Sequence, residues 1–281
     1  MKKAIVTLCV GKMYEDLFDV NCRKNWQLYC DKFGYDLIVI NELLDKTDRA
    51  FKRSAAWQKL LVLSQDWSSQ YDRIVWVDAD ILINCQHATD IADGVPIDKV
   101  GAVDAYSIPS KDLHDISLER RYAFWKKNNI AYLDNRDPNS YYTNRGINAE
   151  GLKNVVHTGV MVCSPHYHKA IFEDVYNHYE DANKDNWNYE MPALSYELIK
   201  ADIVHWISPR FNFIVISLLA SFYPDLLQKQ RKFTRRVLNR LLKFTPYTYT
   251  SKYEKACLKN IYDLSIFMHF AGNASMMKNK F

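Results

Sequence analysis

Two aspartates, Asp78 and Asp80, directly follow a short apolar run, Ile74 to Val77, and precede a second one, Ile81 to Ile83. The first run predicts a buried strand of a parallel sheet. Residues two apart in a strand share a face, so both carboxylates can converge at the strand's carboxyl end, where open α/β sheets bind ligands. Paired carboxylates suit magnesium or manganese held with substrate phosphates. The alternative is an Asp-x-Asp that only ends a strand in a turn, and the apolar flanks favour the metal site.

The segments around these aspartates predict alternating strands and helices. A helix over about 15–33 is expected to stop at Gly34, and Ser54 is suited to cap a second helix running to about Trp67. This strand–helix–strand–helix–strand order predicts an α/β fold with a mostly parallel, doubly wound sheet flanked by helices. The expected strands are Ala4 to Val10, Asp36 to Ile40, the run before Asp78, and Val100 to Val103, which ends at Asp104.

The middle of the chain, from Tyr106 to Asn154, loses this pattern and mixes aromatic with polar residues. An irregular insertion of this length is usually a binding loop or lid. Beyond it the regular pattern returns. The elements expected there are a strand from Val155 to Cys163, helices over about 165–179 and from the 186–192 segment to Leu198, and a strand from Ile203 to Ile207.

Composition limits the class of protein. The chain has 281 residues, of which 48% are hydrophobic, enough for one large α/β domain or a domain with an appended subdomain. The net charge of +4 is mild, which argues against a nucleic-acid partner. The six cysteines form no CxxC pair, so we expect reduced, structural thiols and a reducing compartment.

Neither a secretory signal nor a membrane span is predicted. The first apolar run is interrupted by Thr7 and is too short for a signal core. The longest apolar stretch, Phe211 to Phe222, falls short of the roughly 20 residues that cross a bilayer. We therefore expect a soluble, cytoplasmic protein.

Residues 226–244 carry seven Lys and Arg side chains and no acid, with apolar residues at helical spacing. This pattern predicts an amphipathic helix that lies on an anionic membrane face, which would place the protein peripherally on the inner face of a membrane. The alternative is a helix packed on the rest of the protein with its charges solvated.

Several segments together resemble the GT-A-type glycosyltransferases, especially their small retaining galactosyl- or xylosyltransferase-like branches. The resemblance covers about residues 3–207 and 266–273, and the ordered set is more specific than any one motif. The segments are Trp57-x-Lys59, Val75 to Ile83 with its Asp-x-Asp, Asp104, His157-Thr-Gly-Val160, Tyr189-Glu-Met-Pro-Ala-Leu194 and His269-Phe-Ala-Gly272.

The resemblance implies a GT-A-type, Rossmann-like catalytic core at 1–207, with an acceptor-side insertion at 106–154. A basic helical region at 208–265 and a segment at 266–281 that returns to the metal site would follow. It also implies transfer of a sugar from a nucleoside-diphosphate sugar, with a UDP-hexose as the expected donor, to a hydroxyl of a glycan or lipid-linked glycan. Manganese is the expected ion, with magnesium as the alternative.

The resemblance also suggests roles for single residues. Asp80 and His269 would be metal ligands, and Asp78 would contact the metal or the ribose. Other expected contacts are Lys59 and Gly272 with the donor phosphates, Thr7 and Tyr14 with the nucleotide base, Asp104 and Glu190 as catalytic or sugar-contacting acids, and His157 and Thr158 with the sugar or acceptor. Each has a plainer interpretation, such as a core histidine at His269 or an acid that favours a helix start at Glu190.

Two departures from the family pattern leave the stereochemistry open. The family often has Asn at the position of His157, and Asp-Gln where this chain has Glu190-Met191. The carboxylate is kept, but the amide that faces the donor sugar in some retaining relatives is absent. Two other functions remain as alternatives: a nucleotidyltransferase, which typically has a more Gly-rich loop after the first strand, and a non-catalytic glycan- or membrane-binding module.

Overall fold

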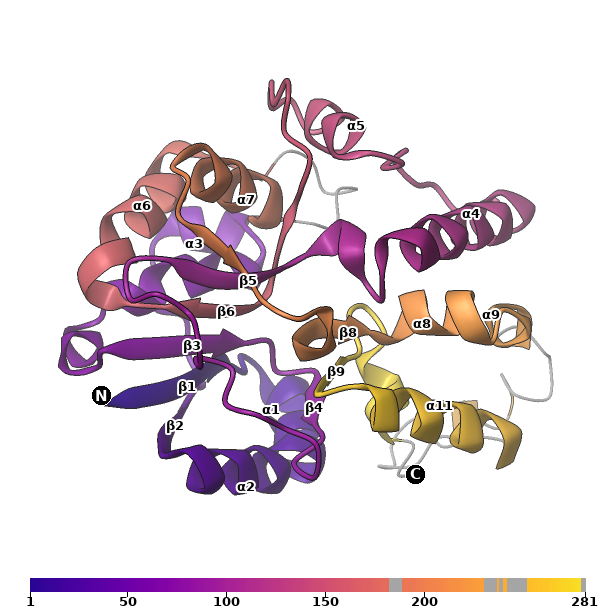
Figure 1. Ribbon diagram of the computed structural model, residues 1–281, viewed down its shortest axis with the longest axis horizontal. Coiled ribbons are helices and arrows are strands. Elements are labelled where there is room, and N and C mark those ends of the chain that lie inside the picture. The colour runs from indigo at the N-terminus through magenta and orange to yellow at the C-terminus, as the bar shows by residue number, and fades with distance from the viewer. Residues whose placement is uncertain (182–188, 230–236, 238–239, 242–251, 279–281) are drawn as a thin grey trace.

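Three parallel strands form one half of the main sheet in the computed structural model, which describes residues 1–181, 189–229, 237, 240–241 and 252–278 (Figure 1). They are β1 (Lys3–Leu8), β2 (Tyr35–Ile40) and β3 (Arg73–Val77), with β1 in the centre. Their apolar β-branched residues alternate between the two faces, so that Ile5 and Val75 pack on one side and Val6 and Ile74 on the other. The predicted parallel half-sheet is confirmed.

The other half of the sheet contains one reversed strand. β6 (Val156–Cys163) is antiparallel to both β3 and β5 (Val100–Asp104), and β7 (Val204–Trp206) is parallel to β5 at the edge. The full order is β2-β1-β3-β6-β5-β7. The predicted α/β class and mostly parallel sheet are therefore confirmed. The hydrophobic pattern of residues 155–163 predicts a strand. It does not indicate whether that strand is parallel or antiparallel to its neighbours.

A second, three-stranded sheet joins distant parts of the chain. β4 (Ile81–Ile83) pairs with β9 (Phe267–His269), which in turn pairs with β8 (Phe213–Ile214). In this ladder Ile81 lies opposite His269. The small sheet therefore brings the C-terminal histidine beside the residues that follow β3.

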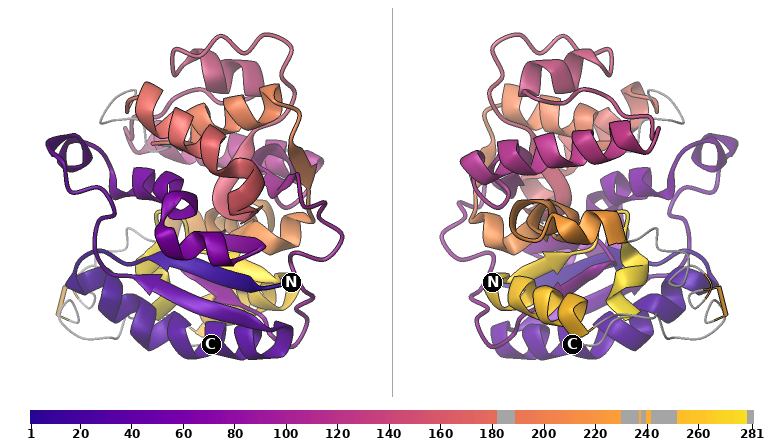
Figure 2. Two further views of the ribbon diagram at one scale, coloured as in Figure 1. Left: turned by 90° about the vertical axis from the view of Figure 1, so that its left-hand side faces the viewer. Right: turned by 90° about the vertical axis from the view of Figure 1, so that its right-hand side faces the viewer.

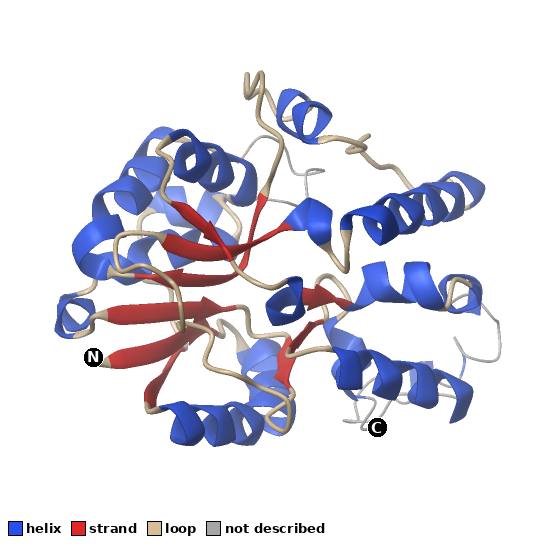
Figure 3. Ribbon diagram, in the orientation of Figure 1, coloured by secondary structure: helices blue, strands red, loops and turns tan. Residues whose placement is uncertain are grey.

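Helices pack on both faces of the main sheet (Figures 2 and 3). One face is covered by α1 (Lys12–Phe18), a π-helical turn (Asp19–Arg23) and α2 (Lys24–Phe33), which Gly34 ends in a left-handed conformation as predicted. The other is covered by the 3₁₀ helix η2 (Ala55–Ser64), α6 (Pro165–His178) and α7 (Met191–Lys200). Ser54 caps η2, as expected, but this segment is 3₁₀ rather than α-helical.

The prediction of an irregular segment from 106 to 154 was wrong. It contains α4 (Lys111–Lys127), capped by Ser110, and α5 (Pro138–Thr143), capped by Asp137. The buried stripe of α4 includes His114 and Ser117, so the apolar periodicity that marks a helix is weak in the sequence.

The remaining short elements connect these layers. They are α3 (Asp48–Lys52), η3 (Asp66–Gln70), η4 (Ala105–Ser107), η5 (Pro209–Asn212), α8 (Val215–Phe222), α9 (Asp225–Lys229), α11 (Lys252–Leu264) and η6 (Ala274–Lys278). Within the described ranges, none of the helices has both the length and the hydrophobicity needed to cross a bilayer. Most of the predicted basic helix at 226–244 lies outside the described residues.

Candidate metal centre

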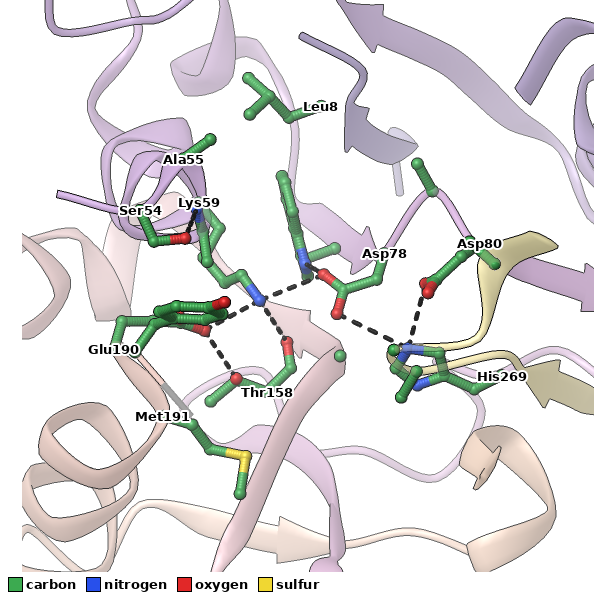
Figure 4. A pocket seen from close by; sticks show the side chains of 18 of the residues that line it. Leu8, Ser54, Ala55, Lys59, Asp78, Asp80, Thr158, Glu190, Met191 and His269 are labelled. Atoms are coloured by element: carbon green, nitrogen blue, oxygen red, sulfur yellow. Dashed lines mark hydrogen bonds and ion pairs between the residues drawn. The ribbon is translucent and has the colours of Figure 1, made fainter. Parts of the chain in front are cut away.

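A cavity of about 530 Å³ opens where the carboxyl ends of β1 and β3 meet the segment after β9 (Figure 4). Its volume is within the roughly 300–1,000 Å³ of small-molecule sites. Among the residues that line it are Tyr14, Ser54, Lys59, Trp76, Asp78, Asp80, His157, Thr158, Gly159, Tyr189, Glu190, His269 and Gly272. Most of the residues predicted to act together are therefore in one place.

Asp78, Asp80 and His269 form a group of potential metal ligands at the edge of this cavity. One ligand atom from each lies within 4.8 Å of the others. His269 Nε2 is 3.1 Å from an Asp80 carboxylate oxygen and 3.9 Å from one of Asp78. Burial alone would lower the pKa of His269, but the charge and hydrogen bond of Asp80 outweigh burial and raise this pKa. Two carboxylates and one imidazole fit a divalent cation.

Gly159 makes room for this group. A Cβ atom at this position would lie 2.6 Å from His269 Cε1 and 3.1 Å from Asp78 Oδ2. The Gly159 carbonyl also accepts a hydrogen bond from the Asp78 amide, at 2.9 Å. The backbone of β6 thus approaches both ligand-bearing segments more closely than a residue with a side chain would permit.

Behind the metal centre, Asn212 lies between two histidines. Its Oδ1 is 2.8 Å from His269 Nδ1, and its Nδ2 is 2.8 Å from His157 Nδ1. The amide of Gly159 donates to the same His157 nitrogen at 3.2 Å. Burial is the main cause that lowers the pKa of His157 to about 3, so this imidazole is neutral.

On the other side of Asp78, Lys59 joins two acids. Its Nζ lies 3.1 Å from Asp78 Oδ1 and 2.9 Å from Glu190 Oε1 (Figure 4). Thr158 Oγ1 donates to Glu190 Oε1 at 2.8 Å. Burial alone would lower the pKa of Lys59, but the two carboxylates raise it, so the ammonium keeps its proton. Burial raises the pKa of Glu190, and the Lys59 charge opposes part of that rise.

Trp76 completes the surroundings of Asp78, because its Nε1 donates to Asp78 Oδ1 at 2.8 Å. That oxygen therefore accepts hydrogen bonds from both Trp76 and Lys59. Asp78 Oδ2 is the oxygen that faces His269. The two oxygens of one carboxylate are thus divided between a protein contact and the metal centre.

Two of the predicted site residues lie elsewhere. Thr7 is fully buried in β1 and is not among the cavity-lining residues. Asp104 is also absent from the lining, and its carboxylate accepts four internal hydrogen bonds, from Tyr106 N, Val155 N, Ser107 Oγ and Asn154 Nδ2. Asp104 therefore organises the turn after β5, and its expected contact with a sugar stays a prediction.

Sequence reasoning missed the roles of Asn212, Trp76 and Gly159. Asn212 is fully buried within an otherwise apolar stretch, and a buried polar residue of this kind requires a partner, which was the available signal. Trp76 belongs to an apolar strand, and its position there does not indicate the hydrogen bond to Asp78. Nothing in the sequence indicated that Gly159 would face His269, because their contact depends on the pairing of β9 with β4.

Comparison with known proteins finds similarity in three-dimensional structure alone. No protein-family model matches the chain, and no curated protein matches it in sequence.

Three similar structures are of glycosyltransferases. A glycosyltransferase involved in the glycosylation of the major capsid of PBCV-1 is 12% identical, with a TM-score of 0.47, over 98% of both chains. The galactosyltransferase LgtC is 14% identical, with a TM-score of 0.44, over 96% of this chain and 87% of its own. Mouse xyloside xylosyltransferase 1 is 7% identical, with a TM-score of 0.41, over 81% of this chain and 93% of its own.

Proposed function

We propose that this protein is a metal-dependent glycosyltransferase that uses a nucleoside-diphosphate sugar, with a UDP-hexose as the donor. The observation that carries the proposal is the Asp78–Asp80–His269 group at the edge of a cavity of about 530 Å³. The cavity is at the carboxyl ends of parallel strands, where ligands bind to open α/β sheets. Apart from Asp104, each motif that resembles the GT-A-type enzymes contributes at least one residue to the lining of this cavity.

In this reaction the bond between the anomeric carbon and the diphosphate oxygen breaks, and a bond to an acceptor hydroxyl oxygen forms as that hydroxyl loses its proton. A bound divalent cation would offset the charge that develops on the leaving diphosphate. Asp78, Asp80 and His269 would hold the cation. The mixed oxygen and nitrogen donor set favours manganese over magnesium, which prefers oxygen ligands.

The neighbouring residues would orient the sugar. Glu190 lines the cavity and is held by Lys59 and Thr158, so its carboxylate is fixed in position. We propose that Glu190 takes up the acceptor proton or stabilises positive charge on the sugar. Tyr189, whose backbone has a φ of 43°, lies beside it on the cavity wall, where its ring can pack on a sugar. Segment 106–154 would form the acceptor side.

Release of nucleotide from a panel of UDP-, GDP- and ADP-sugars with manganese tests the proposal. A glycosyltransferase should release the nucleoside diphosphate from one donor class, faster with a suitable glycan acceptor. The variant Asp80→Asn should lose this release. Pyrophosphate release from a nucleoside triphosphate and a sugar phosphate would instead support a nucleotidyltransferase, and no turnover with any donor would support a binding module.

We also propose that residues 226–244 attach the protein to an anionic membrane, where a lipid-linked glycan would be available as acceptor. The support is the run of seven cations without an acid. Each cation near an anionic surface contributes about 1 kcal/mol, and salt weakens this attraction. Co-sedimentation with anionic vesicles at low salt, but not with neutral vesicles or at high salt, is the expected result. Equal binding to both vesicle types would contradict it.

A further inference from the structure

A chain of hydrogen bonds behind the metal centre has only one consistent arrangement of protons. It runs from the Gly159 amide to His157 Nδ1, from Asn212 Nδ2 to the same nitrogen, and from His269 Nδ1 to Asn212 Oδ1. A backbone N–H can only donate, so the Gly159 amide requires His157 Nδ1 to be an acceptor. The proton of neutral His157 must then be on Nε2.

This requirement passes on to Asn212. The atom of Asn212 that faces His157 Nδ1 has to be a donor, which is the amide nitrogen Nδ2. The amide oxygen then faces His269 Nδ1, at 2.8 Å, and a carbonyl oxygen can only accept. His269 Nδ1 must therefore carry a proton. The remaining ring nitrogen of His269, Nε2, is the one that faces Asp78 and Asp80.

We propose that Asn212 is the positioning residue of the metal centre, and that the Gly159–His157–Asn212 chain holds His269 in the tautomer that offers Nε2 to a metal. This inference deepens the proposed function and rests on its metal site. A metal-bound histidine generally donates its other ring N–H to a fixed acceptor, which sets ring orientation and ligand basicity. Asn212 Oδ1 is such an acceptor, and Asn212 is fully buried, so water does not compete for it.

The hydrogen-bond chain also explains what a histidine does at position 157, where the GT-A-type family that the sequence resembles often has Asn. The imidazole reaches Asn212 from β6 and accepts from two donors at one nitrogen. The ring of His157 is 5.5 Å from that of His269 in an edge-to-face arrangement, so the two histidines also support each other by packing.

Manganese affinity of two variants tests the role of Asn212. Asn212→Leu has a similar size but no acceptor, and we expect it to bind manganese about 10- to 100-fold more weakly than the native protein. Asn212→Asp keeps an acceptor for His269 Nδ1 but loses the donor to His157 Nδ1, so we expect its affinity to lie between those of the native protein and Asn212→Leu. Asn84→Leu is the matched control: Asn84 is also buried, and its Nδ2 donates to Tyr262 O, but it does not line the cavity. This control should lose stability and keep native manganese affinity.

The outcomes separate this inference from the proposed function. If Asn212→Leu is folded and binds manganese as tightly as the native protein, the positioning role is wrong. If the native protein binds no manganese, the proposed metal site is wrong. The positions of the protons on His157 and His269 then still test the hydrogen-bond chain. In ¹⁵N NMR spectra of the metal-free protein, with histidine signals assigned through His157→Asn and His269→Asn, we expect a proton on His157 Nε2 and on His269 Nδ1. A proton on His157 Nδ1 would overturn the inference.

Discussion

Lys59 and Glu190 form an ion pair inside the protein: Nζ lies 2.9 Å from Oε1, and the side chains are 5% and 2% exposed. The same ammonium lies 3.1 Å from Asp78, so one cation serves two carboxylates. Removing one partner of a buried pair leaves an uncompensated charge, which costs more than the pair contributes. The three charged side chains on this wall of the cavity, Lys59, Asp78 and Glu190, therefore stabilise one another.

Lys59→Met should strongly destabilise the fold. The substitution leaves Glu190 and Asp78 without their shared cation, at a cost of about 3–5 kcal/mol in the free energy of unfolding. Urea unfolding at neutral pH measures this cost. The control Lys153→Met removes an exposed lysine, and its effect should stay within about 0.5 kcal/mol. A loss of stability for Lys59→Met no larger than that of the control would show that the pair does not support the fold.

Glu190→Gln should lower turnover more than binding. The amide keeps the size of the side chain and an oxygen that can accept from Thr158 Oγ1, but it cannot take up a proton or stabilise positive charge on the sugar. We expect turnover to fall about 10²-fold or more, in line with loss of a positioned acid or base. Donor affinity, measured by calorimetry, should stay close to native. Native turnover together with a lower melting temperature would show that Glu190 has only a structural role.

Gly159→Ala should abolish metal binding in a folded protein. The new methyl group would lie 2.6 Å from His269 Cε1, so the imidazole has to move away from the two aspartates. Gly101→Ala is the matched control, because Gly101 also lies in a strand of the main sheet and its Cβ would meet Val95 and Val162 at 3.0–3.1 Å. Circular dichroism and manganese titration of both variants measure the effect. Equal manganese affinity in the two variants would contradict the geometry described here.

We expect the folded protein to lose stability in mild acid because of His114. Burial and the nearby Arg121 charge lower its pKa from 6.5 to about 4. Between these values the unfolded chain binds a proton that the folded protein does not, so stability falls as the pH drops. Across the whole window this amounts to about 3 kcal/mol. Urea unfolding of the native protein and of His114→Gln should show a smaller fall in the variant, and parallel pH profiles would contradict the assignment.

The parts of the site carried by a local pattern could be predicted from sequence. Asp78 and Asp80 directly follow a strongly apolar strand, and this pattern predicted their place at its carboxyl end. They lie in the turn between β3 and β4, so their convergence comes from that turn and not from the alternation of a strand. His269 required the family resemblance, because a histidine in an apolar segment is otherwise a core residue. Its position beside Asp80 results from β4–β9 pairing, across more than half of the chain.

The contacts that the sequence did not indicate depend on how distant or turning segments of the backbone meet. Asp104 ends a buried strand, as Asp78 does, but its carboxylate accepts hydrogen bonds from the backbone amides of Tyr106, at η4, and Val155. Sequence alone does not reveal these local hydrogen bonds. The partners of Asn212 have no local signal in the sequence, because both of them, His157 and His269, are more than fifty residues away.

Calorimetric titration of a nucleoside diphosphate, UDP first, measures whether the Asp78–Asp80–His269 group holds a metal that binds the donor. We predict that the native protein binds the nucleotide in the presence of manganese, and that chelation of the metal or the Asp80→Asn substitution removes this binding while the melting temperature of the free protein stays close to native. Because a ligand stabilises only the state it binds, manganese and nucleotide together should also raise the native melting temperature. Nucleotide binding of equal strength in native protein and Asp80→Asn, with and without chelator, would contradict the account.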